Sequence, residues 1–320
     1  MHRVRSVAPN EPESGRRLHR AGFVSVVGRP NAGKSTLINA LVGEKVAITS
    51  DKPQTTRHTV RGIVNNQDGQ LVLVDTPGLH RPRTLLGQRL NDEAKGTLAD
   101  VDVIAITFPA DEAIGPGDRF IAAEVAAVRR APKVALVTKS DLVGGEQMVR
   151  QLTSVAALGA ELGMDWAEIV PVSAVDGFQV ELVGSLLTRL LPVGEPLYPV
   201  DARTDEDVET WVSELIREAA LEGVRDELPH SIAVLVDEMG PREDRRPDRP
   251  LTDIHATIFV ERSSQKAIVI GPKGSRLKRV GTAARHEIEA MLGTPVYLDL
   301  HVTVAKDWQR DPRQLRKLGF

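Results

Sequence analysis

The feature that most constrains this chain is segment 28–36, Gly-Arg-Pro-Asn-Ala-Gly-Lys-Ser-Thr, which matches the pattern G-x-x-x-x-G-K-[ST]. It directly follows the β-branched run 23–27 and opens a helical stretch over 37–42. Glycines let backbone N–H groups turn inward around phosphate oxygens, and the N-terminus of the next helix adds partial positive charge. A strand before the pattern and a helix after it are the conditions that support a phosphate-binding loop.

We therefore predict that this loop binds the phosphates of a nucleotide. Lys34 would reach the terminal phosphates, and the hydroxyl of Ser35 would take a Mg²⁺ position. The residues expected to contact the nucleotide here are Gly28, Arg29, Pro30, Asn31, Ala32, Gly33, Lys34, Ser35 and Thr36.

Four more short apolar runs predict further strands, at 71–74, 103–106, 134–137 and 169–172. Continuous apolar runs suit strands that are covered on both faces, and the stretches between them, such as 120–129 and 147–162, are long enough for crossover helices. Residues 21–191 are therefore expected to form an α/β domain with a doubly wound, mostly parallel sheet.

Length and composition limit the number of domains and the class of protein that the chain can form. A chain of 320 residues predicts about two domains. Hydrophobic residues at 41% and charged residues at 27% are ordinary globular values, which excludes collagen-like, mucin-like and wholly disordered chains. The absence of cysteine excludes disulfides, thiolate metal sites and cysteine nucleophiles, and it favours a cytoplasmic location.

No membrane-targeting segment is evident in the sequence. No apolar run approaches the roughly 18 residues that a spanning helix needs. Residues 1–20 are charged and rich in Pro, Ser and Glu, without an apolar core, so we expect a flexible tail rather than a signal peptide or an anchor. Arg16, Arg17 and Arg20 could contact RNA or lipid, but a solvated tail is the favoured interpretation.

A second domain is expected after a linker. Residues 192–206 hold three prolines, a glycine and an acidic run without helical or strand periodicity. Residues 207–320 then predict a helix, with Thr204 or Asp205 as its N-cap, strands at 231–236 and 254–261 around a polar loop 240–250, a glycine-bounded turn, a helix ending near 292 and a strand at 296–304. This order is typical of a smaller α+β domain.

Charge is divided unevenly between the two parts. From Ser231 onward the chain has 16 Lys+Arg and 12 Asp+Glu, whereas the preceding residues have 25 and 32. A basic C-terminal part indicates a nucleic-acid or membrane-surface partner, although an ordinary solvated surface explains so modest an excess equally well.

Three further segments, each at the end of a predicted strand, indicate the base and the metal. Asp75-Thr76-Pro77-Gly78 offers a carboxylate for a Mg²⁺-bound water and a backbone N–H for a γ-phosphate. In Thr138-Lys139-Ser140-Asp141 the carboxylate could accept hydrogen bonds from N1–H and the exocyclic amine of guanine, and Ser173-Ala174 could donate to its carbonyl. Alone, Asp75 could be a helix cap and Asp141 a turn residue, but their joint order favours a guanine nucleotide.

With these motifs in this order, residues 22–320 resemble the Era family, in which a GTPase domain precedes a KH domain. The resemblance implies that 53–57 (Pro-Gln-Thr-Thr-Arg) is a first switch with Thr56 as the second Mg²⁺ ligand, although spacing alone does not decide between the two threonines. It implies GTP hydrolysis by water, with Lys34, Thr56 and Gly78 as the catalytic groups and GTP, GDP and Mg²⁺ as ligands.

Two positions depart from common GTPase patterns. Thr138 stands where an asparagine is usual, so we expect a lower affinity for the nucleotide rather than a loss of specificity for guanine. Leu79 stands where Ras-like enzymes have a glutamine that orients water, so hydrolysis must draw on other elements, and Asn31 resembles a residue that helps hold K⁺ in related GTPases. His58 and His80 flank the switches and are expected to be surface residues rather than bases.

The segment Gly271-Pro272-Lys273-Gly274 precedes a helical stretch that carries Arg276, Lys278 and Arg279. A G-x-x-G turn followed by basic residues can press against a nucleic-acid backbone, and its place in the α+β part predicts a type II KH domain that binds single-stranded RNA. With only 6 Phe, 2 Tyr and 3 Trp in the chain, an RRM or OB-fold surface that stacks bases is disfavoured. The closing segment contains Trp308, Leu315 and Leu318, of which Trp308 is expected to pack rather than to stack on a base.

The resemblance further implies that the RNA is the 3′ end of 16S rRNA, that the chain acts in 16S rRNA processing and 30S subunit biogenesis, and that it is a monomer. Peripheral association with the inner face of the cell membrane is also implied by the resemblance, without an amphipathic or lipidation signal. Three alternatives stay open: an RNA-binding assembly factor in which GTP is only a slow timer, a tRNA-modifying GTPase, and a small-molecule kinase, which segment 139–141 argues against.

Overall fold

The apolar runs of the first part of the chain form neighbouring strands of one sheet. The computed structural model describes residues 18–320 except 51, 53–54, 78–83, 225–227 and 243–249. Within these residues, six strands lie in the order β2-β3-β1-β4-β5-β6, and every neighbouring pair is parallel except β2 and β3. The strands are β1 (Arg20–Val27), β2 (Val60–Asn66), β3 (Gly69–Asp75), β4 (Val103–Pro109), β5 (Lys133–Thr138) and β6 (Trp166–Pro171). The expected doubly wound, mostly parallel sheet is confirmed.

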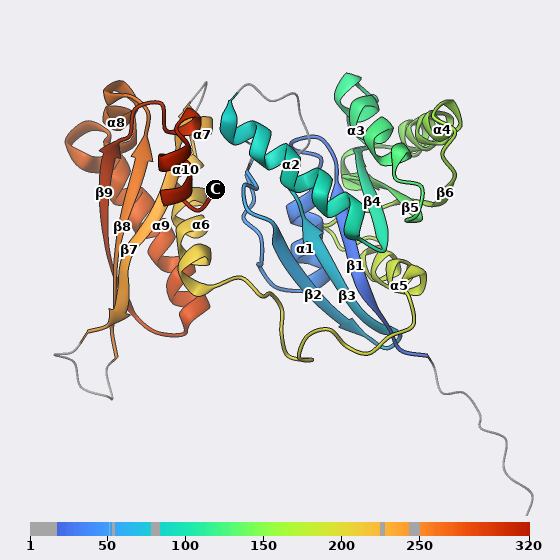
Figure 1. The fold of residues 1–320 in the computed structure, drawn as a ribbon, viewed down its shortest axis with the longest axis horizontal. Helices are drawn as coiled ribbons and strands as arrows, with labels where there is room; N and C mark the ends of the chain where they lie inside the picture. The colour runs from blue at the N-terminus through green and yellow to red at the C-terminus, as the bar shows by residue number, and fades with distance from the viewer. Residues whose placement is uncertain (1–17, 51, 53–54, 78–83, 225–227, 243–249) are drawn as a thin grey trace, which may run out of the picture.

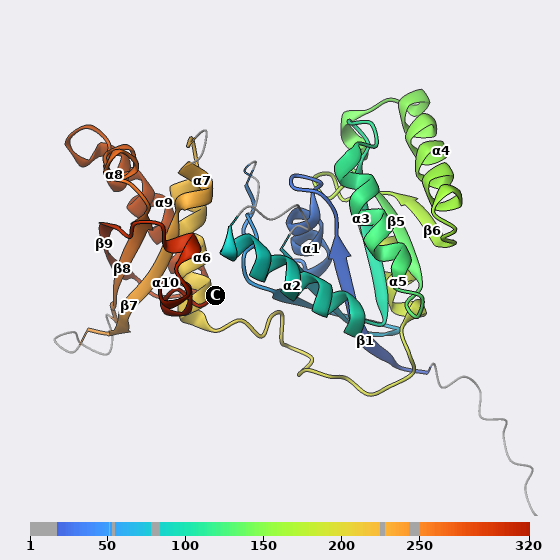
Figure 2. The same ribbon diagram turned by 45° about the horizontal axis from the view of Figure 1, so that its top comes forward.

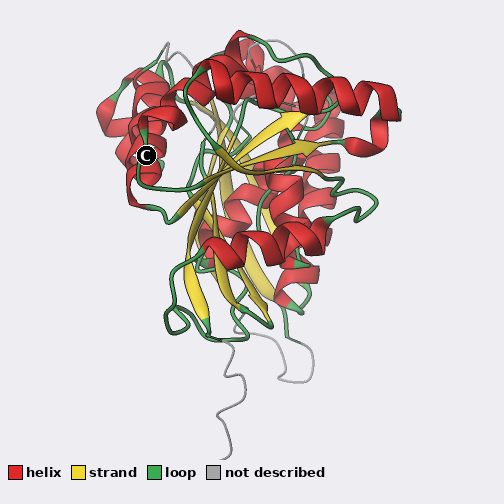
Figure 3. Cartoon of the chain, turned by 90° about the vertical axis from the view of Figure 1, so that its right-hand side faces the viewer, coloured by secondary structure: helices red, strands yellow, loops and turns green. Residues whose placement is uncertain are grey.

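Helices cover both faces of this sheet (Figure 1, Figure 3). They are α1 (Lys34–Val42), α2 (Leu85–Asp100), α3 (Pro116–Ala127), α4 (Gly145–Glu161) and α5 (Val180–Leu190), with a short 3₁₀ turn η1 (Ser140–Leu142) after β5. Leu37 of α1 and Leu187 of α5 pack into one apolar cluster, whereas Leu98 of α2, Ile121 of α3 and Leu158 of α4 pack into the other. Because both faces are covered, strands β3, β4 and β5 are buried along their whole length.

Strand β2 is an element that the sequence patterns did not reveal. It pairs antiparallel with β3 at the edge of the sheet and has no continuous apolar run. In the turn between the two strands, Asn66 Oδ1 accepts hydrogen bonds from the backbone N–H groups of Asp68 and Gly69, at 2.9 and 3.1 Å. An edge strand buries less of its surface than a central one, so its sequence signal is weaker.

The second part of the chain is an α+β domain (Figure 2). Its sheet has the order β7-β8-β9, with β7 and β8 antiparallel and β8 and β9 parallel. Helices α6 and α9 cover one face of this sheet around an apolar core that includes Leu215, Ile254 and Ile288. The elements are α6 (Val208–Leu221), α7 (Leu228–Ser231), β7 (Ala233–Pro241), β8 (Thr252–Val260), α8 (Ser263–Ile270), η2 (Pro272–Gly274), α9 (Ser275–Leu292), β9 (Val296–Val304), η3 (Trp308–Arg310) and α10 (Pro312–Lys317).

Several expected details of this domain were wrong. The N-cap of α6 is Asp207, whose side chain accepts from the backbone N–H of Thr210 at 2.9 Å, rather than Thr204 or Asp205. The stretch before Gly271 is a separate helix, α8, so two helices flank the glycine-bounded turn where one was expected. The run 267–270 is β-branched and apolar, which hid its helical character because short apolar runs do not distinguish a helix from a strand.

The linker is held against the first domain. Figures 1 and 2 show it running from α5 along the edge of the larger sheet to α6. The side chain of Gln70 accepts from the backbone N–H groups of Leu197 and Tyr198 at 2.7 and 2.9 Å, and Ile63 N–H donates to Arg203 O at 2.8 Å. Residues 192–206 therefore have fixed partners on β2 and β3.

The expected N-terminal tail ends earlier than residue 20. Arg20 is the first residue of β1 and pairs with Gly69, and its guanidinium donates to Leu191 O. Arg16 and Arg17 lie outside the described residues. In the described part of the chain, no helix combines the length and the apolar character needed to cross a membrane.

The C-terminal segment packs where the two domains meet. Trp308, Leu315 and Leu318 share an apolar cluster with Leu86 and Leu90 of α2. The Trp308 side chain is fully buried and its Nε1 donates to Ser231 O at 3.0 Å. The expectation that Trp308 packs rather than stacks on a base is confirmed.

Candidate functional site

The loop between β1 and α1 has the backbone geometry that a phosphate-binding loop needs. Gly33 has φ 83° and Asn31 has φ 62°, both in the left-handed region. A Cβ at Gly28 would lie 2.0 Å from Thr107 Oγ1, so only glycine fits there. The loop therefore turns tightly at its start and ends on the N-terminus of α1.

Lys34 is folded over the loop that precedes it. Its Nζ donates to Gly28 O and Arg29 O, both at 3.1 Å, and the side chain is 9% exposed. Burial lowers the pKa of Lys34, while the nearby Asp75 carboxylate opposes this shift. The ammonium group is thus held against the backbone of the loop, where we expect the phosphates of a nucleotide to bind.

Three oxygen-bearing side chains meet beside the first turn of α1. Ser35 Oγ donates to Asp75 Oδ2 at 2.7 Å, and Thr56 Oγ1 donates to the same oxygen at 3.1 Å. The two hydroxyls lie 3.3 Å apart. Thr55 points elsewhere, because its hydroxyl donates to Lys52 O at 2.6 Å.

Asp75 is suited to hold a cation. It is fully buried, and among the described residues its Oδ1 has no hydrogen-bond partner. Burial raises the pKa of Asp75, while Lys34, Ser35 and Thr56 act in the opposite direction. A buried carboxylate oxygen without a partner, next to two hydroxyls, fits the hard oxygen ligands that Mg²⁺ prefers.

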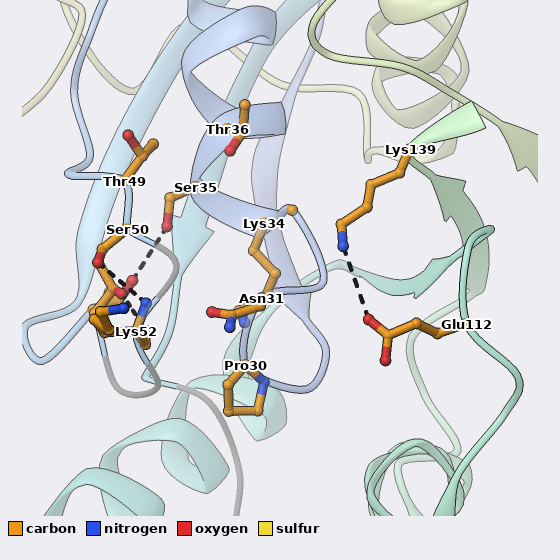
Figure 4. Close-up of a pocket in the computed structure, with 13 residues that line it drawn as sticks. Pro30, Asn31, Lys34, Ser35, Thr36, Thr49, Ser50, Lys52, Glu112 and Lys139 are labelled. Atoms are coloured by element: carbon orange, nitrogen blue, oxygen red, sulfur yellow. Dashed lines mark hydrogen bonds and ion pairs between the residues drawn. The ribbon is translucent and has the colours of Figure 1, made fainter. Parts of the chain in front are cut away.

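Lys34, Ser35 and Thr56 line a cavity of about 410 Å³ (Figure 4). Its walls come from the phosphate loop, from the segment 49–56 and from the ends of β4 and β5. The residues that line it are Pro30, Asn31, Gly33, Lys34, Ser35, Thr36, Thr49, Ser50, Lys52, Thr55, Thr56, Glu112 and Lys139.

The segments expected to recognise the base lie together beyond this cavity. Thr138 Oγ1 donates to Ala32 O at 2.8 Å, which ties the end of β5 to the phosphate loop. Ser140 N–H donates to Val172 O at 3.3 Å, which joins segment 138–141 to the segment containing Ser173 and Ala174. Asp141 is exposed and Ser173 is buried. Two strand ends thus bring these groups together, as the parallel sheet requires.

Two acidic residues of the site were missed from the sequence. Glu112 lies 2.7 Å from Arg29 Nη2 and 4.0 Å from Lys139 Nζ, and Asp111 lies 3.4 Å from the same lysine. Both follow β4 directly, so their position at the carboxyl end of a strand was the available signal. Arg29 also contacts the buried Asp118 at 3.3 Å, so two carboxylates hold its guanidinium.

The other predicted residues of this region differ in their surroundings. Thr76 is buried and Pro77 follows it, whereas Gly78, Leu79 and His80 lie outside the described residues. His58 is half-buried rather than fully exposed as expected, and its ring stacks on Phe320 at a centroid distance of 4.7 Å. Burial lowers the pKa of His58.

The G-x-x-G turn in the second domain has the backbone conformation that its glycines suggest. Gly271 and Gly274 have φ of 72° and 76°, and Lys273 has φ 50°. A Cβ at Gly271 would lie 2.7 Å from Cβ of Arg276. The turn therefore connects α8 to α9 with little room for a side chain at its first position.

A groove of about 380 Å³ begins at this turn. Its lining combines one face of α9 with two leucines of β9: Gly274, Leu277, Lys278, Gly281, Thr282, Arg285, Leu298 and Leu300. Of the predicted RNA-binding residues, Gly274 and Lys278 line it, whereas Arg276 donates to Ala220 O and Glu222 O at the end of α6. Arg279 lies beside Arg276 against α6. Arg285 was missed, although its spacing from Lys278 on one helix shows that both share a face.

Comparison with known proteins agrees with this geometry. A family model described as a 50S ribosome-binding GTPase matches residues 23–139, and a KH domain model matches residues 227–309. GTPase Era of Streptomyces coelicolor is 66% identical over 317 residues, which cover 99% of each chain. The chain belongs to the Era family of GTPases. GTPase Era of a Nocardioides species is likewise 66% identical, over 94% of this chain and 96% of the relative.

Two solved structures of Era proteins also match the fold. One is a variant of Aquifex aeolicus Era bound to GDP and AlF₄⁻, with a TM-score of 0.86 and 38% identity, covering 94% of this chain and 99% of that one. The other is Era in complex with MgGDPNP and nucleotides 1506–1542 of 16S ribosomal RNA, with a TM-score of 0.87 and the same identity and coverage. The chain is thus a GTPase with a C-terminal KH domain, and the predicted guanine nucleotide is confirmed.

Proposed function

We propose that this GTPase hydrolyses GTP with Mg²⁺ held beside its phosphate loop, and that it uses its KH groove to bind single-stranded RNA at the 3′ end of 16S rRNA during assembly of the 30S subunit. The convergence of Ser35, Thr56 and Asp75 beside Lys34 carries the first half of this proposal. The groove that runs from Gly274 along α9 supports the second half, together with the 16S RNA that the matching Era structure holds.

In the GTPase site, catalysis would come from positioning and charge. Ser35, Thr56 and Asp75, the last through a water, would hold Mg²⁺, which supplies compensation for the negative charge of the phosphates. Lys34 would donate to the terminal phosphates from its buried position, and backbone N–H groups of the phosphate loop would bind the remaining oxygens. Gly78 would add one N–H donor at the γ-phosphate. Attack by water needs no covalent intermediate.

Base selection would rest on the strand ends beyond the cavity. Asp141 would accept two hydrogen bonds from guanine, and the backbone around Ser173 and Ala174 would donate to its carbonyl. Lys139 would lie along the base while its ammonium stays near Asp111 and Glu112.

K⁺ is part of the same proposal. Asn31 lines the phosphate cavity from a left-handed backbone conformation, where its side chain carbonyl could bind a monovalent cation beside the phosphates. We expect GTP turnover to be faster in KCl than in NaCl at equal ionic strength, and the difference to disappear in Asn31→Ala. Equal turnover of the natural chain in the two salts would overturn this part.

The RNA proposal is tested by charge reversal in the groove. Lys278→Asp should lower affinity for a single-stranded RNA of the 16S 3′ end by about 10-fold, because a phosphate contact is lost and repulsion is added. Basal GTP hydrolysis should not change.

The matched control is Lys306→Asp, which changes an exposed lysine of the same domain outside the groove. It should leave RNA affinity nearly unchanged. Equal losses in the groove variant and the control would show that only overall charge matters and would refute the groove. Crosslinking of the purified chain to ribosomal RNA with GTP and with GDP would then locate the contact.

The rival proposal is an assembly factor in which GTP hydrolysis is only a slow timer. RNA carrying the 16S 3′ end should strongly stimulate turnover if the two sites are coupled, whereas a timer would show no stimulation. We also propose that the chain acts in the cytoplasm and that it is a monomer. Peripheral contact with the inner face of the membrane would be detected by co-sedimentation with anionic vesicles.

A further inference from the structure

Two buried arginines cross the boundary between the GTPase domain and the KH domain. Arg57 follows Thr56 in the first switch and is 1% exposed. Arg217 lies in α6 of the KH domain and is 2% exposed. Each side chain reaches from its own domain into the other, so the boundary is crossed in both directions.

Arg57 is anchored in the KH domain by backbone carbonyls. Its guanidinium donates to Pro229 O at 3.1 Å, to His230 O at 2.8 Å and to Ile232 O. It also lies 5.7 Å from the ring centre of Trp308. Carbonyls spread around a planar guanidinium match its fork of N–H donors, which lysine cannot reproduce.

Arg217 is anchored in the opposite direction. Its Nη2 donates to Thr55 O in the switch, while its Nε is held by Glu214 Oε1 at 2.8 Å. Glu218, one turn further along α6, accepts from the backbone N–H of Thr49 at 2.8 Å. Helix α6 therefore contacts Thr49, which precedes the first switch, as well as Thr55 within it.

Stability alone does not explain this arrangement. Burial, together with Arg217, lowers the pKa of Arg57 to about 9, so the guanidinium is still charged at neutral pH. The buried carboxylate of Glu214 forms an ion pair with Arg217 and also attracts the charge of Arg57. Buried charges lose much of their attraction to desolvation, and apolar residues often stabilise such places as well or better.

Thr56 stands between these two anchors. The residue before it is held by Arg217 and the residue after it projects into the KH domain, while its own hydroxyl points at Ser35 and Asp75. We propose that the KH domain positions Thr56 for Mg²⁺-dependent hydrolysis, with Arg57 and Arg217 as positioning residues. This inference rests on the proposed function, and it makes the KH domain a structural part of the GTPase site.

The test uses Arg57→Ala and Arg217→Ala in the full chain. We expect the Mg²⁺ concentration for half-maximal hydrolysis to rise and kcat to fall, each by about 10-fold, as is usual when a group that orients a metal ligand is lost. Affinity for a fluorescent non-hydrolysable GTP analogue should become more Mg²⁺-dependent, while affinity for GDP should stay within about 2-fold, because the switch closes over the γ-phosphate.

Arg61→Ala is the matched control. Arg61 forms an exposed ion pair with Asp205 at 2.7 Å and makes no contact with segment 55–57 among the described interactions. It should leave the Mg²⁺ dependence unchanged. Arg217→Lys, which can still donate to Thr55 O, should recover part of the loss, whereas Arg57→Lys should not.

Two results would overturn the inference. One is an unchanged Mg²⁺ dependence in both alanine variants, and the other is an equal loss of GDP and GTP-analogue binding, which would indicate a merely structural role. If an alanine variant does not fold, the Mg²⁺ dependence and the nucleotide affinities of Arg57→Lys and Arg217→Lys provide the test instead. Failure of the natural chain to hydrolyse GTP would instead reject the proposed function.

Discussion

At the scale of single residues, Thr138 shows how a departure from a common motif is accommodated. Its hydroxyl donates to Ala32 O at 2.8 Å, and the side chain is 4% exposed. The hydroxyl proton is therefore used to hold the phosphate loop against β5, and none is left for the base. An asparagine amide has two N–H donors and an acceptor, so it could serve the loop and the base together.

Thr138→Asn is therefore expected to bind GDP about 5- to 10-fold more tightly, the equivalent of one additional hydrogen bond of about 1 kcal/mol. Titration with a fluorescent GDP analogue measures this directly. Thr138→Val, which keeps the shape and removes the hydroxyl, should weaken binding. Affinity of the asparagine variant no better than that of the natural chain would contradict the explanation.

At the scale of elements, the linker carries an unusual carboxyl group. The pKa of Glu206 is raised to about 7 by burial and by the nearby Asp207, Asp205 and Glu214, while Arg61 acts in the opposite direction. The ordinary value is 4.5, so between these two values the folded state binds a proton that the unfolded state releases. The contribution of Glu206 to stability is thus present at low pH and lost as the pH rises through this window.

Glu206→Gln should therefore raise the melting temperature at pH 8 and leave it nearly unchanged at pH 5. Glu206 is half-buried, so solvent screening limits the gain to about 1 kcal/mol, or roughly 2 °C for a chain of this size. Thermal melts at the two pH values provide the measurement. Glu195→Gln, an exposed residue of the same linker, is the control and should have no effect at either pH.

At the scale of the whole molecule, the C-terminal segment joins the two domains. Leu315 of α10 is fully buried in a cluster that contains Leu86 and Leu90 of α2 as well as Phe259 of β8. A contact network of this kind crosses from the KH sheet to a helix that covers the GTPase sheet. Loss of packing at Leu315 should therefore reduce the stability of both domains.

Leu315→Ala is expected to lower the free energy of unfolding by about 3 kcal/mol, as is typical for a buried leucine that leaves a cavity. Urea unfolding measures the total, and hydrogen exchange should increase in α2 as well as in α10. Val304→Ala, at a position 37% exposed at the end of β9, is the control and should change stability by less than about 0.5 kcal/mol. An increase of exchange confined to α10 would show that the domains are not coupled there.

The sequence by itself determined the class of both domains, the phosphate loop and the order of the guanine segments. These features depend on local patterns: a glycine-rich turn between a strand and a helix, apolar runs, and polar residues at strand ends. Such patterns depend on residues close together in the sequence, so the proposed roles of Lys34, Ser35, Asp75 and Asp141 could be predicted from their places in the chain. Strand β2 and helix α8 were missed because an edge strand and a short apolar helix leave weak patterns.

Only the tertiary structure decided which groups from distant segments meet. Thr56 rather than Thr55 faces Asp75, Glu112 joins Arg29 and Lys139, and Arg57 enters the KH domain. Arg276 likewise follows the G-x-x-G turn in sequence but binds the end of α6. Such contacts depend on how helices and sheets pack together, and no local periodicity encodes that packing.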